Sequence, residues 1–179
     1  MNTRTPNPPM DENRIVSLIT DAETGLLSEA FFRLRLDEEF KKSWRYRWVC
    51  TLVLIEVEGL AAIETREGRA AADSLMLDVA GEVLTASRDV DLAARMGRSR
   101  FAMFLPGTPA DGARTMVQRV MTGVLERVQQ RVSLSVGMSE APQDQLSATD
   151  EFLGRAETAL GTARSQGSNQ VVTWNARST

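Results

Sequence analysis

The sequence predicts an α+β fold in which a central, mostly antiparallel sheet is flanked by helices. Residues 48–57 form an almost continuous apolar run rich in β-branched side chains, which is typical of a buried central strand. Residues 92–96 and 101–105 are apolar segments on either side of a short tip, 97–100, which indicates a hairpin. Residues 69–87 carry apolar side chains at helical spacing. Strands and helices mixed along one chain in this way favour a sheet with flanking helices.

The N-terminal end differs in composition from the rest of the chain. Residues 1–20 begin with a proline-containing stretch that has few apolar side chains, which predicts a flexible tail. The apolar residues within 11–19 favour a short helix there. We therefore divide the chain into a tail, residues 1–20, and one domain, residues 21–175.

The other predicted elements follow from caps and periodicity. Ser28 is a plausible N-cap, and Pro109 begins a helix at a position that proline tolerates. Residues 131–138 alternate apolar and polar side chains, as a strand does. In full, the predicted helices are 28–44, 69–87, 109–128 and 148–165, and the predicted strands are 48–57, 92–96, 101–105, 131–138 and 170–174.

Composition argues against several kinds of function. The net charge of −3 argues against general binding to nucleic acid or to an anionic membrane. Cys50 is the only cysteine and there is no histidine, so neither a disulfide framework nor a site built on these ligands is expected. No window approaches the roughly 18 apolar residues of a membrane span, and no signal-peptide pattern begins the sequence. We expect a cytoplasmic protein without a bound metal or cofactor.

Seven short motifs occur in an order and spacing that indicate one family. They are DAETGL (21–26), LIEVE (54–58), a segment containing Gly68 and Asp73, FAMFLPGT (101–108), SVG (135–137), AETAL (156–160) and GSNQV (167–171). Together they resemble the GGDEF domain of diguanylate cyclases over residues 21–174. Each motif alone is weak, but seven in order are specific. The resemblance implies the ferredoxin-like palm fold of nucleotidyl cyclases.

The resemblance also implies that the metal site is damaged. The family's signature loop aligns with residues 97–101, which read GRSRF. Active members hold a metal with the first acidic residue of the strand motif, Glu56 here, and with an acidic residue of the loop. This chain has Ser99 at that loop position, and an uncharged hydroxyl is a poor ligand for a hard cation. Arg100 replaces the glutamate that follows.

The nucleotide contacts implied by the family have changed as well. Gly97 remains, but the second glycine is Arg98, whose side chain would project towards the nucleotide. Positions used on guanine align with Glu64 and Asp73, and positions that grip phosphate align with Arg164 and Ser168. We predict that no catalytic residue remains and that cyclase activity is lost. The degenerate former active site comprises Glu56, Glu64, Asp73, Gly97, Arg98, Ser99, Arg100 and Arg164.

These residues also permit simpler interpretations. Arg95, Arg98 and Arg100 could form an anion-binding or partner-binding tip, or only a solvated hairpin end. Glu56 and Glu58 could be polar residues at a strand end that hold no metal.

The motif RxxD, which the family uses to bind its product, is intact. Arg88 and Asp91 supply its arginine and aspartate, and Arg119 stands at the expected spacing after Pro106 for the third contact. Arginine can form paired hydrogen bonds with guanine or phosphate, and aspartate can accept from guanine N–H groups. A surface ion pair is the alternative interpretation of Arg88 and Asp91.

The sequence therefore predicts a catalytically inactive GGDEF-like domain that binds cyclic di-GMP through Arg88, Asp91 and Arg119. Ligand binding would regulate a protein partner and could promote a homodimer. Two alternatives remain open at this point. One is a ligand-independent interaction scaffold that uses the arginine-rich tip or the N-terminal segment. The other is a GTP-binding regulator that uses Glu56, Asp73 and Arg164.

Overall fold

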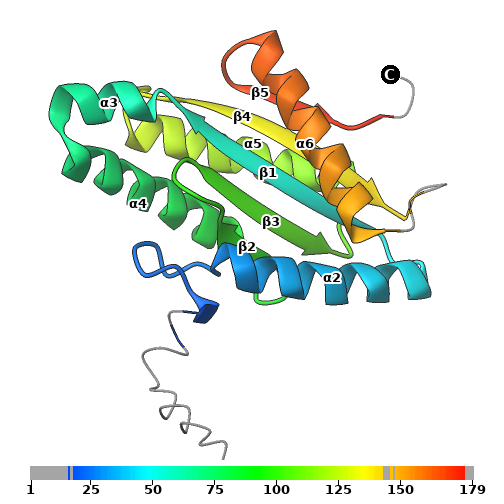
Figure 1. Ribbon diagram of the computed structural model, residues 1–179. Coiled ribbons are helices and arrows are strands. Elements are labelled where there is room, and N and C mark those ends of the chain that lie inside the picture. The colour runs from blue at the N-terminus through cyan, green and yellow to red at the C-terminus, as the bar shows by residue number, and fades with distance from the viewer. Residues whose placement is uncertain (1–15, 17, 143–145, 147, 176–179) are drawn as a thin grey trace, which may run out of the picture.

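A five-stranded sheet forms the centre of the computed structural model, which describes residues 16, 18–142, 146 and 148–175 (Figure 1). The strand order is β2-β3-β1-β4-β5, and only the β4–β5 pair is parallel. The predicted α+β class with a mostly antiparallel sheet is confirmed. The strands are β1 Cys50–Glu58, β2 Leu92–Arg95, β3 Arg100–Pro106, β4 Ser133–Ala141 and β5 Gln170–Thr173.

Helices cover both faces of this sheet. In Figure 1, α6 crosses in front of the sheet and α5 lies behind it. One buried cluster joins α3, α4 and α5 to one face, and a second joins α2 and α6 to the other. The helices are α2 Glu29–Tyr46, α3 Leu60–Glu67, α4 Arg69–Ala86, α5 Ala110–Arg127 and α6 Thr149–Gln166. In the described part of the chain, no helix is both long and apolar enough to cross a membrane.

Helix α3 and the start of β1 differ from the sequence prediction. Helix α3 was not predicted, because its eight residues carry only two buried side chains, Leu60 and Ile63. Strand β1 begins at Cys50, and Trp48 is 59% exposed instead of lying in the buried strand. Most of the predicted tail, residues 1–15 and 17, lies outside the described residues. Residues 16, 18 and 19 are helical.

A glycine in β4 determines how closely α6 approaches the sheet. A Cβ atom at Gly137 would collide with the backbone of α6 at Ala156 and Leu160. The small residue of the SVG motif is therefore a packing requirement. This close contact holds Glu157, which follows Ala156 on α6, near the end of the sheet where β1 stops.

Strand β2 separates the two regions that the sequence singled out. The RxxD residues precede its first residue, Leu92, and the arginine-rich tip follows its last, Arg95. Four residues of strand span about 13 Å at the usual rise per residue. The two regions are therefore neighbours in sequence but lie at opposite ends of one strand.

Candidate functional site

An ion pair joins the hairpin tip to Glu56, the position where the resemblance implies a metal ligand. Glu56 and Arg100 lie directly opposite each other in the β1–β3 register. Arg100 Nη2 is 2.7 Å from Glu56 Oε2, and the Ser99 hydroxyl donates to Glu56 Oε1 at 3.1 Å. Burial lowers the pKa of Arg100, but the hydrogen bond and charge of Glu56 and the charge of Glu157 outweigh it, so the pKa is raised. Arg100 therefore carries its positive charge where the resemblance implies a metal.

Arg100 also reaches across to α6. Its Nη1 donates to both carboxylate oxygens of Glu157, at 3.0 and 3.1 Å. The guanidinium thus ties β1, β3 and α6 together. Sequence reasoning missed Glu157 as a site residue, although it occupies the acidic position of the AETAL motif. That position was the available signal.

Arg98 contacts Glu64 and Asp73, the two residues at positions that the resemblance implies for guanine recognition. Arg98 Nη2 is 2.7 Å from Glu64 Oε2, and Arg98 Nη1 is 3.7 Å from Asp73 Oδ1. Arg69 approaches the other oxygen of Asp73 at 3.4 Å. Glu64 is on α3 and Asp73 on α4, so one side chain links the tip to both helices. The projection of Arg98 towards a nucleotide stays a prediction.

The tip is only partly solvated, because Gly97 and Arg98 are exposed while the arginine at the end of β2 packs inside. Arg95 is buried, and its Nε donates to the Gly97 carbonyl at 2.6 Å. Its Nη2 donates to the Arg98 carbonyl, and the guanidinium lies 5.0 Å from the centre of the Phe101 ring. Burial lowers the pKa of Arg95. Arg95 therefore supports the turn from within, where the positive φ of 73° at Gly97 permits the reversal.

The residues at this end do not fit the metal that the resemblance implies. Both oxygens of Glu56 accept hydrogen bonds from Ser99 and Arg100. Glu58 accepts from the Ser135 hydroxyl at 2.7 Å and is 3.9 Å from Arg164 Nε. Across the described residues, no three acidic or cysteine side chains come together as a metal site. A guanidinium stands where a divalent cation would need free carboxylate oxygens.

The RxxD motif lines a separate hollow of about 380 Å³. Arg88, Asp89 and Asp91 supply its polar groups. Its remaining lining residues are Gly25, Leu26, Leu27, Leu84, Ser87, Leu92 and Ala93. The structure thus brings Arg88 and Asp91 to one hollow, beside apolar side chains. Leu84 is 60% exposed there.

A turn holds Asp91 in place. Its Oδ2 accepts from the backbone N–H of Arg88 at 2.8 Å, and its own N–H donates to the Arg88 carbonyl at 3.0 Å. The other oxygen, Oδ1, is shielded and has no hydrogen-bond partner within the described residues. The Arg88 guanidinium likewise makes no ion pair within that part of the chain. The ion pair of the alternative interpretation is therefore not formed between these two side chains in that part of the chain.

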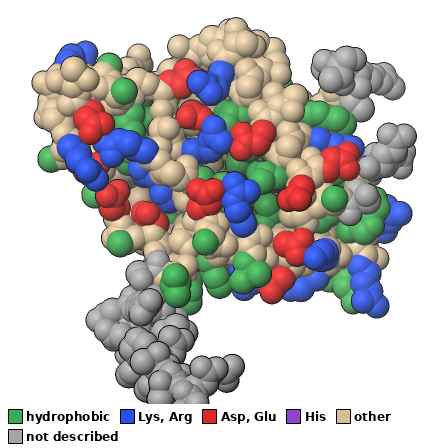
Figure 2. Space-filling view, viewed as in Figure 1, with side chains coloured by type: hydrophobic (Ala, Val, Ile, Leu, Met, Phe, Trp, Pro, Cys, Tyr) green, Lys and Arg blue, Asp and Glu red, His purple; other side chains and the backbone are tan. Residues whose placement is uncertain are grey.

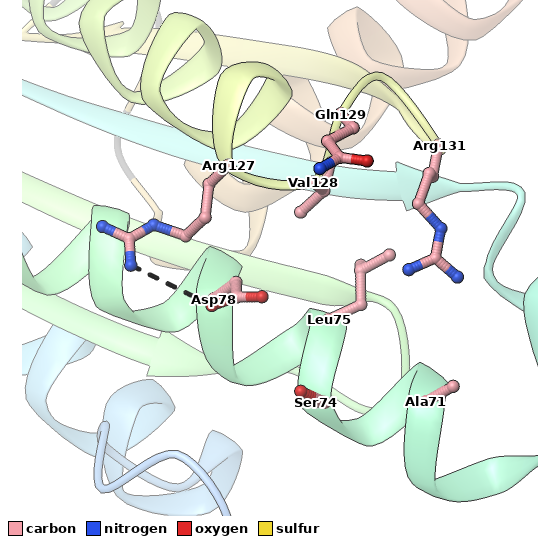
Figure 3. A pocket seen from close by; sticks show the side chains of 8 residues that line it. All are labelled: Ala71, Ser74, Leu75, Asp78, Arg127, Val128, Gln129 and Arg131. Carbon is pink, nitrogen blue, oxygen red and sulfur yellow. Dashed lines mark ion pairs between the residues drawn. The ribbon is translucent and has the colours of Figure 1, made fainter.

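Arg119 is exposed and does not line the RxxD hollow. Its place on α5 follows from the way α5 packs on α4. Arg127 of α5 pairs with Glu82 of α4 at 2.7 Å and with Asp78 at 4.0 Å, beside another hollow of about 320 Å³ (Figure 3). A Cβ at Gly123 would collide with Glu82. Arg119 precedes Gly123 by one turn of α5, towards the end of α4 that leads to Arg88. Its contact with a ligand stays a prediction.

Comparisons with known proteins agree with this architecture. The family model described as "Diguanylate cyclase, GGDEF domain" matches residues 18–170. The chain is 28% identical over 156 residues to the probable diguanylate cyclase DgcC of Escherichia coli, covering 84% of this chain and 42% of that protein. It spans less than half the length of the curated relatives it matches.

Solved structures share the fold. The GGDEF domain of DgcB from Caulobacter crescentus, in complex with c-di-GMP, superposes with a TM-score of 0.80 at 21% identity, covering 87% of this chain and 95% of that chain. Diguanylate cyclase SiaD from Pseudomonas aeruginosa, in complex with its activator SiaC, gives a TM-score of 0.79 at 26% identity, covering 89% and 63%. The family match spans most of the sequence, and the chain belongs to the GGDEF domain family.

Proposed function

We propose that this domain is a cytoplasmic cyclic di-GMP receptor that has lost diguanylate cyclase activity and regulates a protein partner. The contrast between its two sites carries the proposal. At the former active site, Arg98 and Arg100 are engaged by carboxylates of the same chain. At the RxxD hollow, Arg88 and Asp91 line the same surface, and Arg88 forms no ion pair within the described residues.

Loss of catalysis follows from what a cyclase must do. Joining two GTP molecules requires a metal-held triphosphate and an oriented attacking hydroxyl. Here Glu56 forms an ion pair with Arg100, and Arg98 forms ion pairs with Glu64 and Asp73. Each 1.4 kcal/mol or so of lost transition-state stabilisation lowers the rate about tenfold. The same contacts weigh against the GTP-binding regulator, because Glu56 and Asp73 are already paired.

The RxxD hollow offers the groups that a guanine nucleotide needs. Arg88 can donate a pair of hydrogen bonds to guanine or phosphate, and a carboxylate such as that of Asp91 can accept from guanine N–H groups. Leu84 and Leu92 provide apolar surface for a base. Arg119 would supply the third contact from α5. The complex of the DgcB domain with c-di-GMP supports this ligand class.

A receptor needs an output, and a protein partner is the kind we propose. The complex of SiaD with its activator SiaC supports a protein partner for a domain of this family. Because stacked guanines present two faces, the ligand could also bridge two copies of this domain. Ligand-promoted dimerisation is therefore part of the proposal.

Isothermal titration calorimetry with cyclic di-GMP is the direct test. Arg88→Ala should weaken binding by about 10–100-fold, since a hydrogen bond to a charged group contributes about 1.5–3 kcal/mol. Arg33→Ala is a matched control, because Arg33 is an exposed arginine on α2 that pairs with Glu29. The control should bind as the wild type does.

Two further assays separate the alternatives. Incubation with GTP and Mg²⁺ should yield no cyclic di-GMP, and appreciable product would overturn the loss of activity. Absence of binding at tens of micromolar ligand would remove the receptor proposal and leave the ligand-independent scaffold. Equal weakening by Arg88→Ala and Arg33→Ala would show that the RxxD hollow is not the site.

A further inference from the structure

A cluster of alternating aromatic and arginine side chains lies at the C-terminal end of α2. We name residues 44–48, with the sequence WRYRW, the aromatic–arginine corner. Tyr46 is 54% exposed and Trp48 59% exposed, and their rings stack with centres 5.1 Å apart. The Arg45 guanidinium lies 5.7 Å from the Tyr46 ring centre, and Arg47 lies 4.7 Å from that of Trp44. Large aromatic surface is thus presented to solvent together with two cations.

The backbone at this corner has a conformation that arginine disfavours. Arg47 caps α2 with a φ of 55°, in the left-handed region that glycine usually occupies at helix ends. The Trp48 N–H donates to the Ser43 carbonyl at 3.0 Å, which closes the turn. This turn brings Trp48 back onto Tyr46. Glycine would suit the fold better here, so the arginine side chain points to a role other than stability.

The charges of the corner are not neutralised by nearby carboxylates. Within the described residues, Arg45 and Arg47 form no ion pair, whereas Lys41 and Lys42 of the same helix pair with Asp37 and Glu39. Blue and green side chains gather at the C-terminal end of α2, at the lower right of Figure 2. A chain with a net charge of −3 therefore carries a local positive, aromatic surface.

The composition of the corner favours a protein partner over other macromolecules. Tryptophan, tyrosine and arginine are the residues most enriched among those that dominate protein–protein binding energy. Two guanidiniums without ion pairs are too few to bind a nucleic acid well, because that binding depends on many phosphate contacts. They are also few for an anionic membrane, where basic clusters usually hold four to eight cations. Charge complementarity then requires an acidic partner surface.

We propose that the aromatic–arginine corner is a docking surface for an acidic segment of a partner protein. Carboxylates of the segment would pair with Arg45 and Arg47, and its apolar side chains would pack on the exposed rings of Tyr46 and Trp48. The corner lies on α2, away from Arg88 and Asp91, so this proposal does not depend on cyclic di-GMP binding.

Nuclear magnetic resonance of the tryptophan indole groups can test the corner with a defined probe. The chain has three tryptophans, and Trp174 lies under Arg155, outside the corner, as an internal reference. An unlabelled peptide of four Glu-Glu-Leu repeats should shift the indole signals of Trp44 and Trp48 but not that of Trp174. The corresponding Lys-Lys-Leu peptide should cause no shift. No response to the acidic peptide at millimolar concentration, or an equal response to both peptides, would overturn the proposal.

Arg47→Gly separates docking from folding. It should leave the melting temperature unchanged or raised, because glycine suits the left-handed backbone, and should weaken peptide binding roughly fivefold, the equivalent of one cationic contact. Gln129→Gly is the matched control. Gln129 has a φ of 53° after α5, and the N–H of the next residue, Gln130, donates to the Leu125 carbonyl at 2.9 Å, as the Trp48 N–H does to Ser43 at the corner. This control should bind normally, and equal weakening would argue against the proposal.

Other occupants give distinct results in the same experiment. Phosphatidylglycerol vesicles or an oligothymidine that shifted the corner signals at lower concentration than the acidic peptide would overturn the proposal. Corner signals that moved on dilution of the protein alone would indicate a second copy of the chain, and would overturn it as well.

Discussion

At the scale of single residues, two arginines form internal ion pairs at the end of the sheet where the resemblance implies a metal and a nucleotide. Arg100 lies opposite Glu56 on neighbouring strands and also binds Glu157 on α6. The sequence alone showed that the loop had lost its acidic ligand and that Arg98 would project inwards. It could not show the partners of these arginines, because ion pairing depends on strand register and on the approach of α6.

The two arginines of the tip should contribute unequally to stability. The Glu56 and Arg100 side chains are 16% and 27% exposed, whereas Glu64 and Arg98 are 38% and 43% exposed. A double-mutant cycle with Glu56→Gln and Arg100→Gln should give a coupling energy of about 1–3 kcal/mol, since solvent screens this hydrogen-bonded pair only partly. The cycle for Glu64→Gln and Arg98→Gln should give less than about 1 kcal/mol.

Urea denaturation of the wild type, the four single variants and the two double variants measures both coupling energies. The exposed pair should weaken further when salt is raised, because its charges are screened. Equal couplings at both pairs would contradict the view that Arg100 is the structural replacement at this site.

At the scale of elements, close backbone contact decides where α6 sits. Gly137→Ala in β4 should destabilise the fold by at least about 3 kcal/mol, because the new methyl group meets backbone atoms of α6 that cannot rotate away. Gly154→Ala on α6 is the matched control: its Cβ would meet open space, and alanine should stabilise the helix by about 0.5–1 kcal/mol. Thermal unfolding of both variants measures the difference. A Gly137→Ala protein as stable as the wild type would show that α6 can move aside.

Sequence periodicity predicted long helices well and the short one not at all. The predicted helix 109–128 corresponds to α5, which buries a face that includes Ala113, Val117 and Val120. Helix α3 was missed because two buried apolar residues over two turns form too short a pattern to distinguish a helix from a loop. This omission hid the placement of Glu64, which α3 brings to Arg98. Long helices can be predicted from the apolar periodicity of their own residues, whereas short helices depend on packing against neighbouring elements.

At the scale of the whole molecule, β2 places the two sites at its opposite ends, so they can change independently. Mutations separated by more than about 7–10 Å without shared partners usually have additive effects. The four residues of β2 span about 13 Å. Within the described residues, no hydrogen bond or ion pair joins Arg88 or Asp91 to the tip arginines. This arrangement explains how one site could lose its chemistry while the other kept its side chains.

Independence of the two sites predicts a specific pattern of ligand stabilisation. Cyclic di-GMP at 100 times its Kd should stabilise the wild type by about 2.7 kcal/mol, the increment expected for a ligand that binds only the folded state. Arg98→Ala and Arg100→Ala should lower the starting stability yet show the same increment. Arg88→Ala should keep near-normal starting stability but retain only about 0.4–1.4 kcal/mol of the increment at that ligand concentration, because its Kd is expected to be about 10–100-fold weaker. Urea unfolding with and without ligand measures all four proteins. A smaller increment in Arg100→Ala would show that the tip and the RxxD hollow are coupled through β2.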